Sequence, residues 1–189
     1  SSYAFAFDID GVLLRGKGVL PGARDALRRL RDRDVPFVFV TNGGGCTEAA
    51  KAEELSNMFD LEVSRDIVLL SHSPMRELAP MYRDRRVLVL GNAAKEIAAE
   101  DVGLHNTVTA HEVASENPGI FHFVGDKWYV PRDLPTHKPS PSCGGDSPSR
   151  ESVAAVMALH DPLDWLLELQ VVVDVLAGGT PPGTGGGDG

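Results

Sequence analysis

The chain has 189 residues, of which 42% are hydrophobic and 24% are charged, and its formal net charge at pH 7 is −9. A chain of this length can bury a real core in one domain or two small ones, and its acidity argues against binding nucleic acid through a broad basic face. Two cysteines are too few for a disulfide scaffold, so a reducing compartment is the default, and no apolar run reaches the ~18 residues of a membrane span. An anionic ligand would need positive charge fixed locally, by a metal ion and a few cations.

The first predicted element is an apolar strand over residues 4–7, which ends in Asp8, Ile9, Asp10 and Gly11. Such a run is typical of a buried parallel strand, and open α/β sheets bind ligands at the carboxyl ends of their strands. The two acids are two residues apart, so their side chains are expected to project to the same side. Two close carboxylates need a cation, a proton or hydrogen bonds, and among metal ions Mg²⁺ fits these oxygen ligands best.

This acid pair suits phosphoryl transfer through a covalent aspartyl-phosphate. Asp8 would attack phosphorus. Asp10 would protonate the leaving oxygen and later deprotonate the water that hydrolyses the intermediate. The alternative interpretation is a solvated turn with ordinary acids.

A second strand is predicted over residues 35–40, and a glycine-rich loop follows it directly. Between the two strands an amphipathic crossover helix is predicted from the helical spacing of Ala23, Ala26, Leu27 and Leu30. The loop reads Thr41, Asn42 and then three glycines, 43–45, whose backbone N–H groups can cradle a phosphate. Thr41 could donate its hydroxyl to a phosphoryl oxygen, and Asn42 could orient the substrate or the acid. A glycine-rich turn without a ligand is the alternative.

Further strand and helix units are predicted downstream. Thr47 is interpreted as the N-cap of a helix whose buried stripe comprises Ala52, Leu55, Met58 and Phe59. A strand at about 67–70 leads to Ser73 and Pro74, which are expected to cap and start the next helix. Residues 86–90 begin another strand–helix unit, which closes near Gly103.

Two reactive side chains near these strand ends have a structural and a functional interpretation. For His72, a loop histidine bonded to the backbone is favoured over a substrate contact. Cys46 lies beside the glycine loop, but nothing nearby marks it as a nucleophile, so it is interpreted as a bystander.

The region from residue 117 to 150 reads as a long irregular segment rich in proline, serine and glycine. Within it, residues 124–126 (Val-Gly-Asp) and 138–140 (Lys-Pro-Ser) look like short phosphatase motifs, but their order is reversed and both are treated as coincidence. Residues 153–159 and 163–176 are predicted as further regular elements, and 178–189 have the composition of a flexible linker.

The segment Asp8-Ile9-Asp10-Gly11-Val12 resembles the first motif of the haloacid dehalogenase superfamily of aspartate-nucleophile hydrolases, and Thr41-Asn42-Gly43-Gly44 resembles its second motif. The second motif is similar to that of the subfamily with a large α/β cap (type IIA). A closer resemblance, to the family of haloacid dehalogenase-like hydrolase domain-containing protein 5, is carried by the opening block of the chain and by residues 67–75, 164–165 and 169–176. The acid at Asp10 implies a phosphatase, because an alkoxide leaving group needs a proton and a halide does not.

The resemblance implies an α/β fold, with a Rossmann-like parallel-sheet core, here truncated, and an α/β cap domain. We expect residues 1–85 to form the N-terminal half of the core, residues 86–177 to form the cap with its irregular segment 117–150, and residues 178–189 to form a tail. The implied activity is a Mg²⁺-dependent phosphatase of small phosphorylated metabolites. Its expected site has two catalytic, metal-binding residues and four that bind phosphate: Asp8 and Asp10, and Thr41, Asn42, Gly43 and Gly44.

A complete member of that family would carry a lysine and a Gly-Asp metal motif after the cap, and neither is found convincingly in this sequence. The alternative function is therefore a catalytically weak or inactive binding or interaction module. The resemblance alone implies a mitochondrial location and a link to glycerophospholipid metabolism; the alternative location is cytoplasmic, and assembly into a homo-oligomer is left open. Because the chain begins with Ser1 and not with methionine, we expect a removed leader or a fragment.

Overall fold

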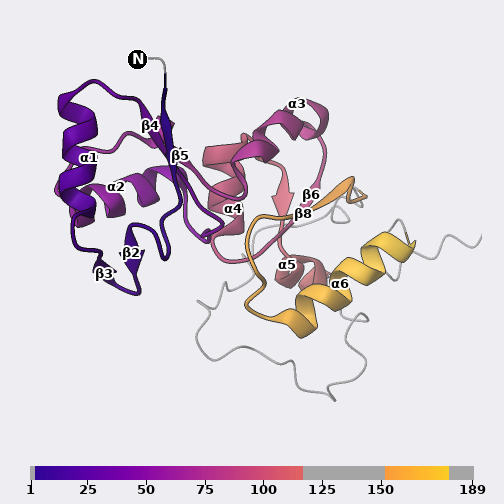
Figure 1. Cartoon of the computed structure of the whole chain (residues 1–189). Coiled ribbons are helices and arrows are strands. Elements are labelled where there is room, and N and C mark those ends of the chain that lie inside the picture. The colour runs from indigo at the N-terminus through magenta and orange to yellow at the C-terminus, as the bar shows by residue number, and fades with distance from the viewer. Residues whose placement is uncertain (1–2, 117–151, 179–189) are drawn as a thin grey trace, which may run out of the picture.

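The computed structural model describes residues 3–116 and 152–178, which form an α/β structure with two small parallel sheets (Figure 1). The first sheet has the strand order β1-β4-β5, the second has the order β7-β6-β8, and a short antiparallel hairpin pairs β2 with β3. The strands are β1 (Phe5–Phe7), β2 (Leu14–Arg15), β3 (Gly18–Val19), β4 (Phe37–Val40), β5 (Val68–Leu69), β6 (Val87–Leu90), β7 (Thr107–Val108) and β8 (Ala155–Ala158).

Helices connect the strands of each sheet, as parallel pairing requires. In the first half of the chain they are α1 (Ala23–Asp32), α2 (Glu48–Phe59), the 3₁₀ turn η1 (Arg65–Ile67), the 3₁₀ helix η2 (Ser73–Leu78) and α3 (Ala79–Tyr82). In the second half they are α4 (Ala94–Ile97), the π-helical turn η3 (Ala98–Val102), α5 (Ala110–Glu116) and α6 (Trp165–Gly178). The predicted α/β class with parallel sheets is therefore confirmed.

The first sheet is built as the sequence predicts. Strand β1 pairs in parallel with β4, with Phe5 opposite Phe37, and β4 pairs in parallel with β5. The predicted crossover helix is α1, which buries Ala23 and Leu27 in the same core as Phe39. Helix α2 begins after Thr47, whose side chain accepts a hydrogen bond from the Ala50 amide at 3.3 Å, so the predicted N-cap is confirmed.

The prediction that β1 is a buried strand is wrong for the part of the chain that the structure describes. Phe5 is 42% exposed, and Ala6 is exposed as well. Strand β1 lies at an edge of its sheet, and side chains alternate between the two faces. The face that carries Phe39 is packed, whereas Val40 and Leu69 on the other face remain 42% and 40% exposed. An apolar run thus predicts a strand but not what covers it.

The second sheet is packed on both faces around its central strand, β6, all four of whose residues are buried. Val87 and Val89 point to one face and belong to the core that includes Ile97 of α4. Leu88 and Leu90 point to the other face and pack with residues of α5 and α6. This alternation gives a three-layer arrangement, which Figure 1 shows with β6 between α4 on one side and the pair α5 and α6 on the other.

Some details differ from the sequence prediction. Ser73 does not cap a helix: its hydroxyl accepts a hydrogen bond from the Leu70 amide at 2.8 Å, and His72 takes the N-cap position of η2. The helix predicted to close near Gly103 ends there, but as the π-helical turn η3, with Gly103 at φ +87°. Residues 117–151 and 179–189 lie outside the described residues, so the irregular segment, its two motif-like pieces and most of the predicted tail lie there too. Among the described residues, every helix is too short or too polar to span a bilayer.

Leu88→Ala tests whether the second sheet forms a packed core. Leu88 is fully buried, so removing the three carbons beyond its Cβ should lower the free energy of unfolding by about 3 kcal/mol. Leu166→Ala is the matched control, because Leu166 of α6 is 70% exposed and its replacement should change stability by less than about 0.5 kcal/mol. Urea denaturation followed by circular dichroism measures both; equal effects of the two substitutions would contradict the described packing.

Candidate functional site

The first candidate loop directly follows β1 and turns its two acids outward. Ile9 is buried, whereas Asp8 and Asp10 on either side of it are exposed, as their two-residue spacing predicts. The Ile9 carbonyl accepts hydrogen bonds from the amides of Leu13 and Leu14, both at 2.9 Å, and so closes a tight turn. The Ile9 amide donates to Asp8 Oδ1 at 2.8 Å, which holds that carboxylate against its own backbone. Buried Ile9 therefore anchors a turn that presents both carboxylates to solvent.

The second candidate loop, after β4, meets the first at Gly43. The Gly43 amide donates to Thr41 Oγ1 at 3.0 Å, and Thr41 itself is buried. A Cβ atom placed on Gly43 would lie 3.3 Å from that hydroxyl oxygen and 3.8 Å from Asp10 Oδ2. Since the Thr41 oxygen accepts from Gly43, its proton is left to donate elsewhere. The structure thus brings Asp10, Thr41 and Gly43 together, while Asn42 between them is exposed.

A histidine that the sequence analysis did not single out lies against the same glycine loop. His160 follows β8, and a Cβ atom on Gly44 would lie 3.1 Å from its Cδ2 and 3.5 Å from Ser71 Oγ. A Cβ atom on Gly45 would lie 3.2 Å from Cε1 of the same ring. The signal available in the sequence was the position of His160 at the end of an apolar run, but nothing local indicates that this strand end faces residues more than a hundred positions earlier.

The carboxyl ends of strands from both sheets converge on this glycine loop. Gly91 and Asn92 directly follow strand β6, and Asn92 Nδ2 donates to the Gly45 carbonyl at 3.1 Å. Gly91, with φ +103°, packs so closely on His160 that a Cβ atom there would lie 2.6 Å from the His160 carbonyl carbon. Parallel sheets place ligands at their carboxyl ends, so this convergence is where an α/β protein is expected to bind one.

Behind the glycine loop, a buried cluster of charged residues links α2, in the first half of the chain, to η3, in the second half. Glu48, the first residue of α2, is 2% exposed, and its amide donates to Asp101 Oδ2 at 2.8 Å. The Glu48 carboxylate accepts from Arg76 and from Ser73 Oγ, the latter at 2.5 Å. Arg65 Nη2 bridges the two acids, at 3.4 Å from each. Two carboxylates thus face two guanidinium groups, which compensates most of the cost of burying charge.

His72 belongs to this cluster and not to the ligand side of the loop. Its side chain is fully buried, and its Nε2 lies 2.8 Å from Asp101 Oδ2. The sequence analysis favoured a structural role for His72, and its burial agrees with that role. The expected partner was wrong, because the ring bonds to a carboxylate and not to the backbone. Cys46 is half-buried beside the loop, and burial raises the pKa of its thiol, which opposes formation of the nucleophilic thiolate.

The donor set for a metal ion consists of the two exposed acids. Within the described ranges, Asp8 and Asp10 make no ion pair, and no three His, Cys, Asp or Glu side chains gather in a way that could hold a metal. Mg²⁺ often binds through one or two carboxylates and keeps several waters, so a pair of exposed, unpaired carboxylates on one turn fits that ion. A tightly bound ion such as structural zinc, with four protein ligands, does not fit it.

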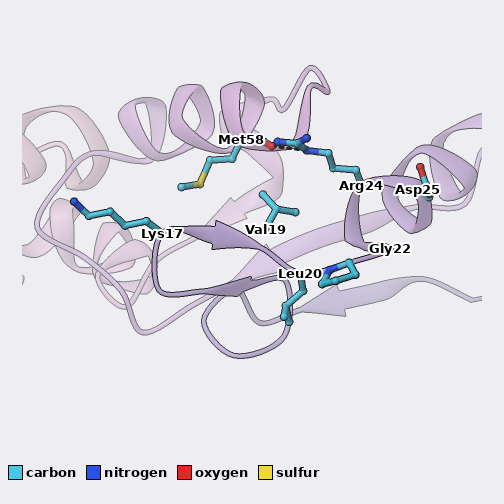
Figure 2. Close-up of a pocket in the computed structure, with 8 residues that line it drawn as sticks. Lys17, Val19, Leu20, Gly22, Arg24, Asp25 and Met58 are labelled. Carbon is cyan, nitrogen blue, oxygen red and sulfur yellow. Dashed lines mark hydrogen bonds between the residues drawn. The ribbon is translucent and has the colours of Figure 1, made fainter.

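A shallow pocket of about 470 Å³ lies elsewhere, between the β2–β3 hairpin, the start of α1 and the end of α2. Figure 2 shows Val19 and Met58 facing each other across it, and Arg24 donating to the Met58 carbonyl at 2.8 Å. The pocket contains none of the predicted site residues. It is therefore not the candidate site.

Comparison with known proteins places the chain among hydrolases. Residues 5–105 match the family model described as haloacid dehalogenase-like hydrolase. A mitochondrial hydrolase of Saccharomyces cerevisiae is 34% identical over 177 residues, which are 92% of this chain and 47% of the yeast protein. Human glycerol-3-phosphate phosphatase is 50% identical over 52 residues, 28% of this chain and 16% of the human protein. The chain thus spans less than half the length of either relative.

A solved structure has the same fold. The crystal structure of a possible sugar phosphatase of the haloacid dehalogenase superfamily from Cytophaga hutchinsonii superimposes with a TM-score of 0.61, at 19% identity, over 93% of this chain and 51% of that one. At this identity the likeness establishes the fold alone. It supports the predicted α/β architecture across both sheets.

Glu48→Gln tests the buried cluster. The substitution keeps the shape of the side chain but removes the charge that faces Arg65 and Arg76, so it should lower the free energy of unfolding by about 2 kcal/mol; the half-exposed arginines recover part of the loss through hydration. Glu54→Gln, on the same helix, removes only the exposed pair with Lys51 and should change stability by less than about 0.5 kcal/mol. Equal urea midpoints for the two variants would refute a stabilising role for the cluster.

Gly91→Ala tests the contact between β6 and His160. Gly16→Ala is the matched control: Gly16 has φ +60° but open space around its Cβ position, so only backbone strain of about 1 kcal/mol is expected. At Gly91, φ is +103°, outside the left-handed region that alanine can adopt, and a Cβ atom would also overlap the His160 backbone, so the free energy of unfolding should fall by roughly 3 kcal/mol. Thermal unfolding measures both. A Gly91 variant no less stable than the Gly16 variant would show that the two strand ends are not in contact.

Proposed function

Because the chain belongs to the family of haloacid dehalogenase-like hydrolases, we propose that it represents a Mg²⁺-dependent phosphatase that works through an aspartyl-phosphate. Asp8 is the proposed nucleophile and Asp10 the general acid and base. Thr41, Asn42, Gly43 and Gly44 are proposed to bind the phosphoryl group. These assignments come from the position of each residue at the strand ends.

One observation carries this proposal: Asp10, one of the two outward-facing acids, lies beside the glycine loop. Asp10 Oδ2 lies 3.8 Å from the Cβ position of Gly43, whose amide is bonded to Thr41. A phosphoryl group placed there would be near a carboxylate on one side and near hydroxyl and backbone N–H donors on the other. Asp8, on the same turn as Asp10, is the proposed attacking group for a phosphoryl group held in these surroundings.

The proposed reaction has two steps. Asp8 forms a bond to phosphorus while the bond to the ester oxygen breaks, and Asp10 gives its proton to the leaving alkoxide. Asp10 then takes a proton from water, whose oxygen attacks phosphorus, releasing inorganic phosphate and restoring Asp8. Mg²⁺ held by the Asp8 carboxylate and the backbone carbonyl of Asp10 would offset the repulsion between Asp8 and the phosphate, and would leave the Asp10 carboxyl group free to carry the proton.

The proposed substrates are small phosphorylated metabolites. The similarity to a glycerol-3-phosphate phosphatase supports this class and suggests a link to glycerophospholipid metabolism. The similarity to a mitochondrial hydrolase supports a mitochondrial location. The acidic net charge of −9 makes nucleic acid a poor partner.

The test is hydrolysis of p-nitrophenyl phosphate with and without Mg²⁺. Asp8→Asn should abolish turnover because an amide is no nucleophile, and Asp10→Asn should lower kcat by about 10²–10⁴. Asp32→Asn, an exposed acid on α1, is the control that should leave turnover unchanged. ³²P from a labelled substrate should become attached to the wild-type chain and not to the Asp8 variant.

Turnover that survives Asp8→Asn would sink the proposed mechanism. A folded wild-type chain with neither turnover nor covalent label would instead support the binding or interaction module. Circular dichroism on every variant separates loss of chemistry from loss of fold.

A further inference from the structure

His160 lies against the glycine loop, and the proposed reaction gives it no role. The Cβ position of Gly45 lies 3.2 Å from Cε1 and 3.3 Å from both ring nitrogens, so it sits over the face of the imidazole. The Cβ position of Gly44 lies 3.1 Å from Cδ2. Both glycines therefore leave room for the ring, which lies flat against their backbone.

The polar atoms of this ring indicate which nitrogen carries the proton. Nδ1 of His160 is buried and has no hydrogen-bond partner in the described part of the chain. An unpartnered buried N–H donor is rarer and more costly than an unpartnered acceptor. The neutral tautomer with the proton on Nε2 is therefore favoured, and His160 as a whole is only half-buried. The ring then has an N–H group to offer to a ligand.

The groups around the ring define what it would bind. Ser71 Oγ lies 3.5 Å from the same Gly44 Cβ position that His160 approaches, and Asp10 approaches the preceding residue, Gly43. A carboxylate thus stands at one end of the loop, and a hydroxyl and an imidazole at the other. Donors of this kind, together with backbone N–H groups, are suited to phosphoryl oxygens.

We propose that His160 is a further phosphate-binding residue, whose Nε2–H donates to a non-bridging phosphoryl oxygen held on the 43–45 loop. This inference rests on the proposed function, because it assumes that the loop binds phosphate. It adds to the site a group from the segment that directly follows β8, a strand of the second sheet. The site then depends on both sheets and not on the first alone.

Isothermal titration with inorganic phosphate in the presence of Mg²⁺ tests the proposal. His160→Asn carries its amide near the Nδ1 position and loses the Nε2 donor, so phosphate affinity should fall at least about tenfold, as expected for a lost bond to a charged group. His160→Gln places an amide N–H near the Nε2 position and should stay within about threefold of wild type. His105→Asn, at an exposed histidine, is the control for general effects.

A second measurement needs no variant. Long-range ¹H–¹⁵N spectra of the wild-type chain should show His160 protonated at Nε2 and bare at Nδ1, and phosphate should shift the Nε2 signal at saturation. A His160 signal that phosphate leaves unmoved, a wild-type chain that binds no phosphate, or equal affinities of the Asn and wild-type chains would each overturn the inference.

The two proposals fail separately. Asp8-dependent turnover with phosphate affinity independent of His160 would keep the phosphatase and reject the role of His160. Phosphate binding that depends on His160, in a chain without turnover or covalent label, would keep the binding role and reject the catalytic one.

Discussion

The contact between Glu48 and Asp101 is the constraint on which the candidate site depends. Glu48 begins α2, three residues after the glycine loop, and its amide donates to Asp101 in η3, which belongs to the second half of the chain. Burying two acids is costly, and the ion pairs with Arg65 and Arg76 offset that cost. Because a buried ion cluster tolerates few geometries, it fixes the start of α2 relative to the second sheet.

This fixed junction explains why a strand of one sheet reaches a loop of the other. With α2 held, the glycine loop before it faces the ends of β6 and β8, where Asn92 bonds to Gly45 and His160 lies on Gly44 and Gly45. The absence of side chains at 44 and 45 then has two physical uses. It exposes backbone N–H groups, and it lets an imidazole approach the backbone closely.

The strand ends carry negative charge, whereas the proposed substrate is an anion that needs positive charge nearby. Asp8 and Asp10 face outward without an ion pair in the described ranges, and the arginines of the nearby cluster are already engaged with Glu48 and Asp101. The hydroxyls of Thr41 and Ser71 and the backbone amides around the loop carry no formal charge. A divalent cation would supply the positive charge that an anionic substrate needs in a protein of net charge −9.

The sequence by itself determined the first parallel strand pair, its crossover helix, the Thr47 cap and the family, because these depend on local hydrophobic periodicity and on short motifs around Asp8 and Thr41. It also gave the outward spacing of Asp8 and Asp10, which follows from the two-residue repeat of extended chain. Only the tertiary structure decided that β1 is exposed, that His72 bonds to Asp101, and that His160 lies on the glycine loop. Those outcomes depend on which surfaces meet in the folded chain, 29 residues apart for His72 and Asp101 and more than a hundred apart for His160 and the glycine loop, and no local pattern encodes such contacts.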